Sequence, residues 1–129
     1  MVSVHNTQNY HNYIYNFNIN EFSINQNTIL DFIVKNHTDI YTTHIKNNNR
    51  LESLLNNNNL KQTLFISINN SINNIYDCLF EGNIEVNDKD LMIINKNNHA
   101  FELSNNKLNG REIIISNIKL QNGILHIIN

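Results

Sequence analysis

The side chains in this sequence that could carry chemistry are six histidines, one cysteine and a group of carboxylates. His126 is the first candidate, because it lies within a run of apolar residues. In that setting it could be a metal ligand or a pH-sensitive contact. It could also be a core histidine that is hydrogen-bonded to the backbone or to a neighbouring side chain. The structural role is the commoner one, and we expect it for His126.

The other histidines and the cysteine form incomplete constellations. His37 and His44 lie seven residues apart and could share a helix face, but two histidines without a third ligand make a poor zinc site. Cys78 with His99 or His126 would resemble a Cys-His catalytic pair, yet the sequence supplies no orienting group or oxyanion hole. We therefore expect Cys78 to pack as a small apolar side chain.

Four carboxylates, Glu81, Glu85, Asp88 and Asp90, cluster around a predicted loop. They could bind a cation weakly, but they lack the spacing of an EF-hand, so a solvated acidic loop is the better interpretation. The sequence contains no Gly-rich phosphate loop, nucleophile elbow or zinc-binding spacing. We therefore expect a protein that is not an enzyme and that needs no cofactor or metal.

Composition limits the partners that this chain can have. Its 129 residues suit one domain, 40% of them are hydrophobic, and the formal net charge is -2. Arginine occurs only at positions 50 and 111, so no basic field is present to bind a nucleic acid backbone. A single cysteine rules out an internal disulfide.

The sequence also bears on the compartment and on the source of the protein. No run approaches the ~20 apolar residues of a membrane span, and the first residues lack the pattern of a signal peptide. We expect an intracellular or virion-associated protein. Asparagine makes up about a quarter of the chain, and isoleucine is also abundant. Both have AT-rich codons, which indicates an AT-rich genome such as that of a parasite or a large virus.

Apolar residues at helical spacing predict three short helices between residues 28 and 55. Thr28 and Asp31 have the spacing of a capping box at the start of the first helix. The second helix includes residues 40–45 and the third residues 51–55, and each is followed by a run of asparagines. These helices form the first half of the predicted domain.

Strands dominate the rest of the sequence. Residues 63–68 predict a buried strand, residues 72–79 predict a helix that ends at Gly82, and residues 91–94 and 99–103 predict two further strands. Two Asn-Gly turns then precede apolar runs, the second of which, residues 124–128, should be buried on both faces. Helices followed by strands indicate an α+β fold, in which N-terminal helices precede a C-terminal antiparallel-rich β-sheet or sandwich.

The first 24 residues are polar with scattered tyrosines and phenylalanines. They could form an aromatic arm that grips a partner, but an N-terminal arm or edge strand that lies on the domain is the simpler interpretation. We expect residues 1–24 to form this arm and residues 25–129 to form one domain.

Two segments resemble the fasciclin domain family. The segment TLFISINNSI, which starts at residue 63, resembles the family's early motif T-hydrophobic-F-A-P-T-polar-polar-A-F. The segment NGILHIIN, which starts at residue 122, is similar to the family's final motif NG-hydrophobic-I-H-hydrophobic-I-D, and another Asn-Gly lies about a dozen residues before it, as is frequent in the family. The residues that carry the resemblance are Thr63, Phe65, Asn109, Gly110, Asn122, Gly123 and His126.

The resemblance implies a fasciclin-like α+β domain over residues 25–129 that acts as a protein-interaction or adhesion-type module and binds another protein through surface loops. The sequence departs from the family at Ser67 and Ile68, which replace Pro-Thr, and at Asp77-Cys78, which stands in place of a Tyr-His pair. The lack of that pair, and of any Arg-Gly-Asp, argues against an integrin-type activity. The alternative is a structural protein that assembles into homo-oligomers, for example in a virus particle.

Overall fold

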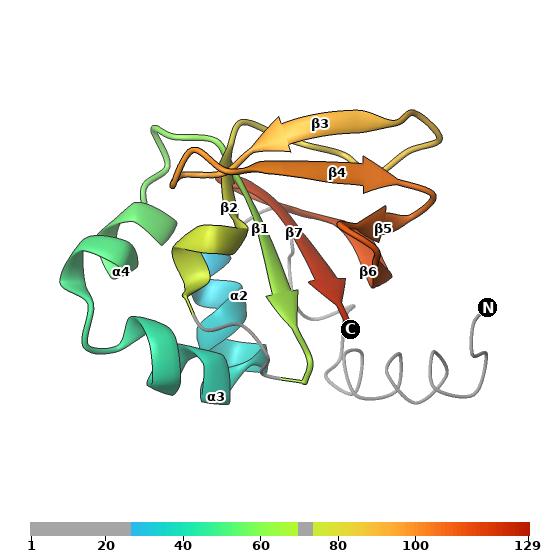
Figure 1. Cartoon of the computed structure of the whole chain (residues 1–129). Coiled ribbons are helices and arrows are strands. Elements are labelled where there is room, and N and C mark those ends of the chain that lie inside the picture. The colour runs from blue at the N-terminus through green and yellow to red at the C-terminus, as the bar shows by residue number, and fades with distance from the viewer. Residues whose placement is uncertain (1–26, 70–73) are drawn as a thin grey trace.

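The computed structural model describes residues 27–69 and 74–129 and shows an α+β fold (Figure 1). Within this part of the chain, short helices come first and pack beside a mixed sheet. The N-terminal arm expected over residues 1–24 lies outside the described residues. Among the described residues, no helix is long and apolar enough to cross a membrane.

The helical layer begins with α2 (Ile29–Asn36), whose start is the predicted capping box. Thr28 Oγ1 accepts a hydrogen bond from the Asp31 backbone N–H at 3.1 Å, and Asp31 Oδ2 accepts one from the Thr28 N–H at 3.2 Å. The predicted second helix is present as α3 (Thr38–Ile40), which continues into the π-helical turn η2 (Tyr41–Ile45). The third is α4 (Asn49–Leu55), capped by the side chain of Asn48.

Seven strands form one sheet in the order β2-β1-β7-β6-β5-β4-β3. β1 and β7 are parallel, whereas the other neighbours are antiparallel. In Figure 1, β3 and β4 run across the direction of β1 and β7. The strands are β1 (Gln62–Ser67), β2 (Leu79–Glu81), β3 (Leu91–Ile94), β4 (Ala100–Ser104), β5 (Lys107–Leu108), β6 (Arg111–Leu120) and β7 (Gly123–Ile128).

The two outer strands of this sheet approach each other. An isolated antiparallel bridge joins Phe80 of β2 to Asn95, the residue after β3. The Lys96 N–H donates to the carbonyl of Leu79 at 2.9 Å beside it. The sheet therefore curls until its edges meet at one point, which encloses the apolar side chains of its concave face.

The helix predicted over residues 72–79 is wrong at its end. Residues 70–73 lie outside the description, the 3₁₀ helix η3 covers only Ile75–Cys78, and Leu79 begins strand β2. Leu79 pairs with Leu64 of β1 and is fully buried there. A short apolar run fits the period of a helix as well as that of a strand. Pairing with β1 places Leu79 in a strand. The short strand β5 was not predicted, and the strand expected over residues 99–103 is shifted to Ala100–Ser104.

The core includes the side chains between the helices and strands β1 and β7, which are buried at every position, and it extends to buried side chains of the other strands. The prediction that the last apolar run is buried on both faces is therefore confirmed, because side chains on both faces of β7 are buried: α2 contacts this strand, and the backbone of Ile84 covers the ring of His126. The largest fully buried side chains are Phe32, Phe65, Phe80, Ile29, Ile33, Ile45, Leu51, Leu55, Leu64, Ile66 and Leu79.

The two Asn-Gly pairs have different roles. Asn109 and Gly110 both have positive φ, 48° and 81°, and form the predicted tight turn between β5 and β6. Strands also flank the second pair, but Gly123 is already the first residue of β7 and pairs with Leu120. The turn itself is made by the two residues before Gly123, so the prediction was wrong in placing that glycine in the turn.

Asn122 connects the sheet to both ends of the helical layer. Its Oδ1 accepts the backbone N–H of Ile29 at 2.9 Å, in the first turn of α2. Its Nδ2 donates to the carbonyl of Leu55 at 2.8 Å, at the end of α4. Helix ends leave such groups without intrahelical partners. One fully buried amide therefore satisfies two helices at once.

Alanine substitutions at Gly123 and Gly110 test how closely β1 and β7 approach each other. A Cβ at Gly123 would collide with the backbone carbonyl of Gln62, whereas a Cβ at Gly110 would meet open space. Gly123→Ala should lower the free energy of unfolding by at least about 3 kcal/mol. Gly110→Ala should cost only about 1–2 kcal/mol, because it strains one residue at positive φ. Urea denaturation of both variants measures the difference, and equal losses would contradict the close approach.

Candidate functional site

His126 is a structural histidine in the centre of the sheet. It is fully buried, and its Nδ1 accepts the backbone N–H of Asn117 at 2.9 Å. Its Nε2 lies 2.8 Å from the carbonyl oxygen of Ile84 and donates to it, which fixes the neutral tautomer with the proton on Nε2. The ring stacks on Phe65 with centroids 4.7 Å apart. Burial lowers the pKa of His126 to about 4, so the ring stays neutral at physiological pH.

Thr63, from the other motif, binds the same segment of chain. Its hydroxyl donates to the carbonyl of Gly82 at 2.7 Å and accepts the N–H of Ile84 at 2.8 Å. Thr63 and His126 lie on the paired strands β1 and β7. The two segments that carry the fasciclin resemblance therefore meet in space, and they meet on the backbone of the residues after Gly82.

Asn117 completes this arrangement, and no motif or spacing in the sequence indicated it. Its Oδ1 accepts the N–H of Val86 at 2.9 Å, and its Nδ2 donates to the Val86 carbonyl at 3.0 Å. Asn117 has φ +61° at an irregularity in the pairing of β6 with β7. Such irregularities redirect a side chain, and asparagine tolerates positive φ better than most residues. Its position inside the apolar run of β6 was the signal that could have revealed it.

We call residues 82–90 the tethered loop, since side chains of β1, β6 and β7 hold its backbone. Its carboxylates face solvent, as expected for a solvated acidic loop. Glu85 pairs with Lys119 at 3.1 Å, and Asp90 accepts the hydroxyl of Ser104 at 2.8 Å. Among residues 27–69 and 74–129, no group of three histidine, cysteine or acidic side chains could hold a metal ion.

The remaining candidates for chemistry lie apart from the tethered loop. His37 is buried between α2 and α3 beside Phe32, and burial lowers its pKa to about 4. His44 is half-buried in η2, and His99 is exposed. Cys78 is buried, and this burial raises the pKa of its thiol to about 11. A thiol with so high a pKa is not a ready nucleophile, which agrees with a packing role for Cys78.

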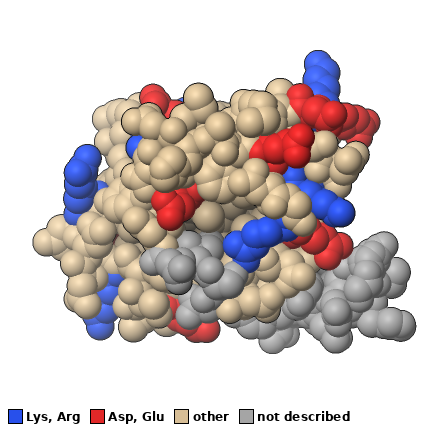
Figure 2. Space-filling model, viewed as in Figure 1, with Lys and Arg blue, Asp and Glu red and all other residues tan. Residues whose placement is uncertain are grey.

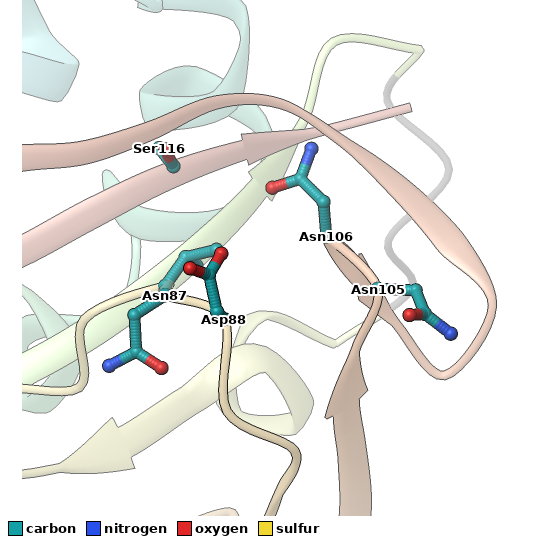
Figure 3. Close-up of a pocket in the computed structure, with 6 residues that line it drawn as sticks. Asn87, Asp88, Asn105, Asn106 and Ser116 are labelled. Carbon is teal, nitrogen blue, oxygen red and sulfur yellow. The ribbon is translucent and has the colours of Figure 1, made fainter.

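A polar hollow of about 370 Å³ lies beside the tethered loop (Figure 3). Three elements enclose it: the tethered loop, the turn between β4 and β5, and strand β6. Its lining consists of one carboxylate, three amides, one hydroxyl and one apolar side chain. These residues are Val86, Asn87, Asp88, Asn105, Asn106 and Ser116.

The walls of this polar hollow are fixed by hydrogen bonds. Val86 is held by Asn117, as described above. Asn106 bonds to Ile113 of β6 twice: its carbonyl accepts the Ile113 N–H at 3.1 Å, and its Nδ2 donates to the Ile113 carbonyl at 3.2 Å. In Figure 3 the side chains of Asp88 and Asn106 both point toward the top of the view, whereas that of Asn105 turns away from them. The hollow is thus formed before any ligand arrives.

A second hollow, of about 610 Å³, has Asn69 and Asn129 on one side and residues around the β5–β6 turn on the other. Its guanidinium, Arg111, already donates to the carbonyl of Asn129 at 3.0 Å and to the hydroxyl of Ser67 at 3.3 Å. Of the two cations that line this hollow, Arg111 is therefore engaged within the chain, and Lys107 lies beside the carboxylate-bearing Glu112 in the same lining. The polar hollow is the stronger candidate site.

An apolar face on β3 is the second surface feature. Met92 and Ile94 alternate along this strand and are 66% and 63% exposed. Figure 2 shows that uncharged side chains cover most of the visible face, with Lys and Arg interspersed among Asp and Glu. Exposed large apolar side chains in one row are candidates for contact with another protein.

Comparison of the chain with protein-family models and with curated proteins finds no match.

The burial of His126 predicts a stability that depends on pH. The folded chain keeps this ring neutral down to a pH of about 4, whereas the unfolded chain takes up the proton near pH 6.5. The unfolded chain therefore binds a proton more readily as the pH falls from 6.5 to about 4. This lowers the free energy of unfolding by up to roughly 3 kcal/mol. Stability from this group should be complete above pH 6.5. His37 should add to the same loss.

Urea denaturation between pH 7.5 and 4.5 measures this effect. His126→Ala should lower the free energy of unfolding at pH 7.5 by about 3 kcal/mol, because two buried backbone groups lose their partner. The variant should also show a shallower pH dependence than the unmodified chain. His99→Ala, which removes an exposed histidine, is the control. An unchanged melting temperature of the His126→Ala variant would contradict a structural role for His126.

Proposed function

We propose that the chain is a non-enzymatic protein-binding module of the fasciclin kind, in which the tethered loop and the β4–β5 turn contact the partner. The observation that carries this proposal is the preformed polar hollow between those segments. Thr63, Asn117 and His126 fix one wall of it from three strands of the sheet. A surface held in shape before binding loses little conformational entropy when a partner docks.

The resemblance to fasciclin domains supports the proposal. Both segments that carry the resemblance contribute a side chain to the same loop, Thr63 from the first and His126 from the second. His126, the first candidate for a metal ligand or a pH-sensitive contact, uses both ring nitrogens on the backbone. The module is proposed to bind a protein through loops and their amide side chains, rather than a nucleic acid.

Affinity capture from cells that carry the protein tests this function. The full chain, tagged at one end, should retain one dominant, saturable partner that mass spectrometry identifies. Ser116→Arg should abolish retention, because Ser116 is exposed on β6 and a large side chain there would fill the polar hollow. Asn58→Arg adds the same side chain at an exposed position after α4 and should retain the partner.

The outcomes of this capture separate the hypotheses. Retention of the partner by all three proteins would contradict binding at the polar hollow. Recovery of only the chain itself from the unmodified protein would contradict the binding module and favour self-assembly.

Self-assembly is the second candidate function, and the exposed apolar row on β3 favours it. β3 is the last strand of the sheet and pairs with β4 on one side. Beyond the bridge at Asn95, its other edge has no strand partner among the described residues. An edge strand with exposed Met92 and Ile94 can associate with a second copy of the chain.

Sedimentation velocity over a wide range of concentrations tests self-assembly. The unmodified chain should show a mass that rises with concentration, and Ile94→Lys should remain monomeric, because it places a charge on the contact surface. Val34→Lys changes an exposed apolar residue on α2, 41% exposed, and should associate as the unmodified chain does. A strict monomer at every concentration would rule out this function.

A further inference from the structure

The polar hollow is lined by one ionised acceptor and by amide and hydroxyl side chains that can both accept and donate hydrogen bonds. Asp88 contributes a carboxylate, and within the described part of the chain no hydrogen bond reaches it. Asn106 donates its Nδ2 to the carbonyl of Ile113, which leaves its Oδ1 free to accept. Ser116 adds a hydroxyl, which can also accept. A ligand that donates hydrogen bonds therefore meets three acceptors here, namely the Asp88 carboxylate, Asn106 Oδ1 and the Ser116 hydroxyl.

Charge favours a cationic ligand. The lining contains one carboxylate and neither lysine nor arginine. The ion pair in the tethered loop joins Glu85 to Lys119, so it does not neutralise Asp88. A cation in the polar hollow would meet an ionised acceptor, and hydrogen bonds to ionised groups are roughly twice as strong as neutral ones.

The size and donor set of the polar hollow distinguish a metal ion from an organic cation. Calcium requires six to eight oxygen ligands at about 2.3–2.6 Å, and its affinity depends on the number of charged ligands. One carboxylate within about 370 Å³ does not provide such a cage. A guanidinium is planar, carries five N–H donors and binds a carboxylate with two parallel hydrogen bonds. It suits a wide hollow with one carboxylate and neutral acceptors around it.

We infer that the polar hollow binds an arginine side chain of a protein partner, with Asp88 receiving the guanidinium and the Asn106 amide oxygen accepting a further N–H. This inference rests on the proposed protein-binding function and names the chemistry of the partner. Because Asn117 and Ile113 hold the walls, the acceptors are in place before the arginine enters. The tethered loop is then the element through which the buried His126 shapes a recognition site.

NMR titration of the ¹⁵N-labelled full chain tests the inference with a small probe, N-acetyl-arginine amide. Saturable shifts should appear at the backbone amides of Val86, Asp88, Asn106 and Ser116, with a dissociation constant on the order of millimolar. N-acetyl-citrulline amide has nearly the same shape but no charge, and it should give no saturable shift. Calcium chloride, added alone, should also leave these amides unchanged.

Two variants remove the same charge from the same loop. Asp88→Asn keeps the shape of the side chain and should weaken the arginine probe about two- to fivefold, the effect of removing an exposed ion pair. Asp90→Asn lies outside the polar hollow and should bind the probe as the unmodified chain does. Spectra that overlay away from the loop show that both variants are folded.

Several results would overturn the inference. They are equal binding of the citrulline probe, saturable binding of calcium at the same amides, shifts that lie elsewhere on the surface, or an unchanged affinity in Asp88→Asn. This failure is separable from failure of the proposed function. Suppose that Asp88→Asn still retains the captured partner, whereas Ser116→Arg loses it. This result would support the protein-binding function and contradict only the recognition of an arginine.

Discussion

The hydrogen bonds of the buried His126 connect the core of this protein to its surface. On one side the ring accepts from the backbone of Asn117, and on the other it donates to the carbonyl of Ile84. An apolar residue in this position would leave two buried backbone groups unsatisfied, at a cost of several kcal/mol. A lysine has no acceptor and would leave the Asn117 N–H unsatisfied. Because the ring must be neutral to accept at Nδ1, the low pKa that burial imposes is part of the same arrangement.

Asparagine side chains elsewhere act where regular backbone pairing ends. Asn122 joins two helix ends, Asn117 pairs with both polar groups of Val86, and Asn109, in the β5–β6 turn, accepts the N–H of Glu102 in β4 at 2.7 Å. A primary amide carries both a donor and an acceptor, so it can replace a peptide group in a hydrogen-bond pair. The high asparagine content thus supplies hydrogen bonds that shape the loops. High asparagine content does not prevent this chain from forming an ordered core.

Local signals in the sequence were sufficient for the elements whose physics is local. The capping box at Thr28, the strand at Thr63 and the Asn109-Gly110 turn depend on neighbouring residues, and the structure contains all three. Leu79 was misassigned because its partner in β1 is distant in sequence. The role of Asn117 depends on an irregularity in strand pairing, and the polar hollow depends on three separate segments. Neither follows from spacing in one segment.

The place of β7 between β1 and β6 sets the order in which the chain can fold. β1 precedes β7 by half of the sequence, yet the two are parallel neighbours from Gln62↔Gly123 to Ser67↔Ile128. Closing so long a loop is entropically costly and slows folding. During synthesis, β1 therefore leaves the ribosome with only the three-residue β2 available on one side and an open edge on the other. Until β7 emerges, the apolar strand β1 can pair incorrectly with other strands. A chaperone would have its greatest effect during this interval.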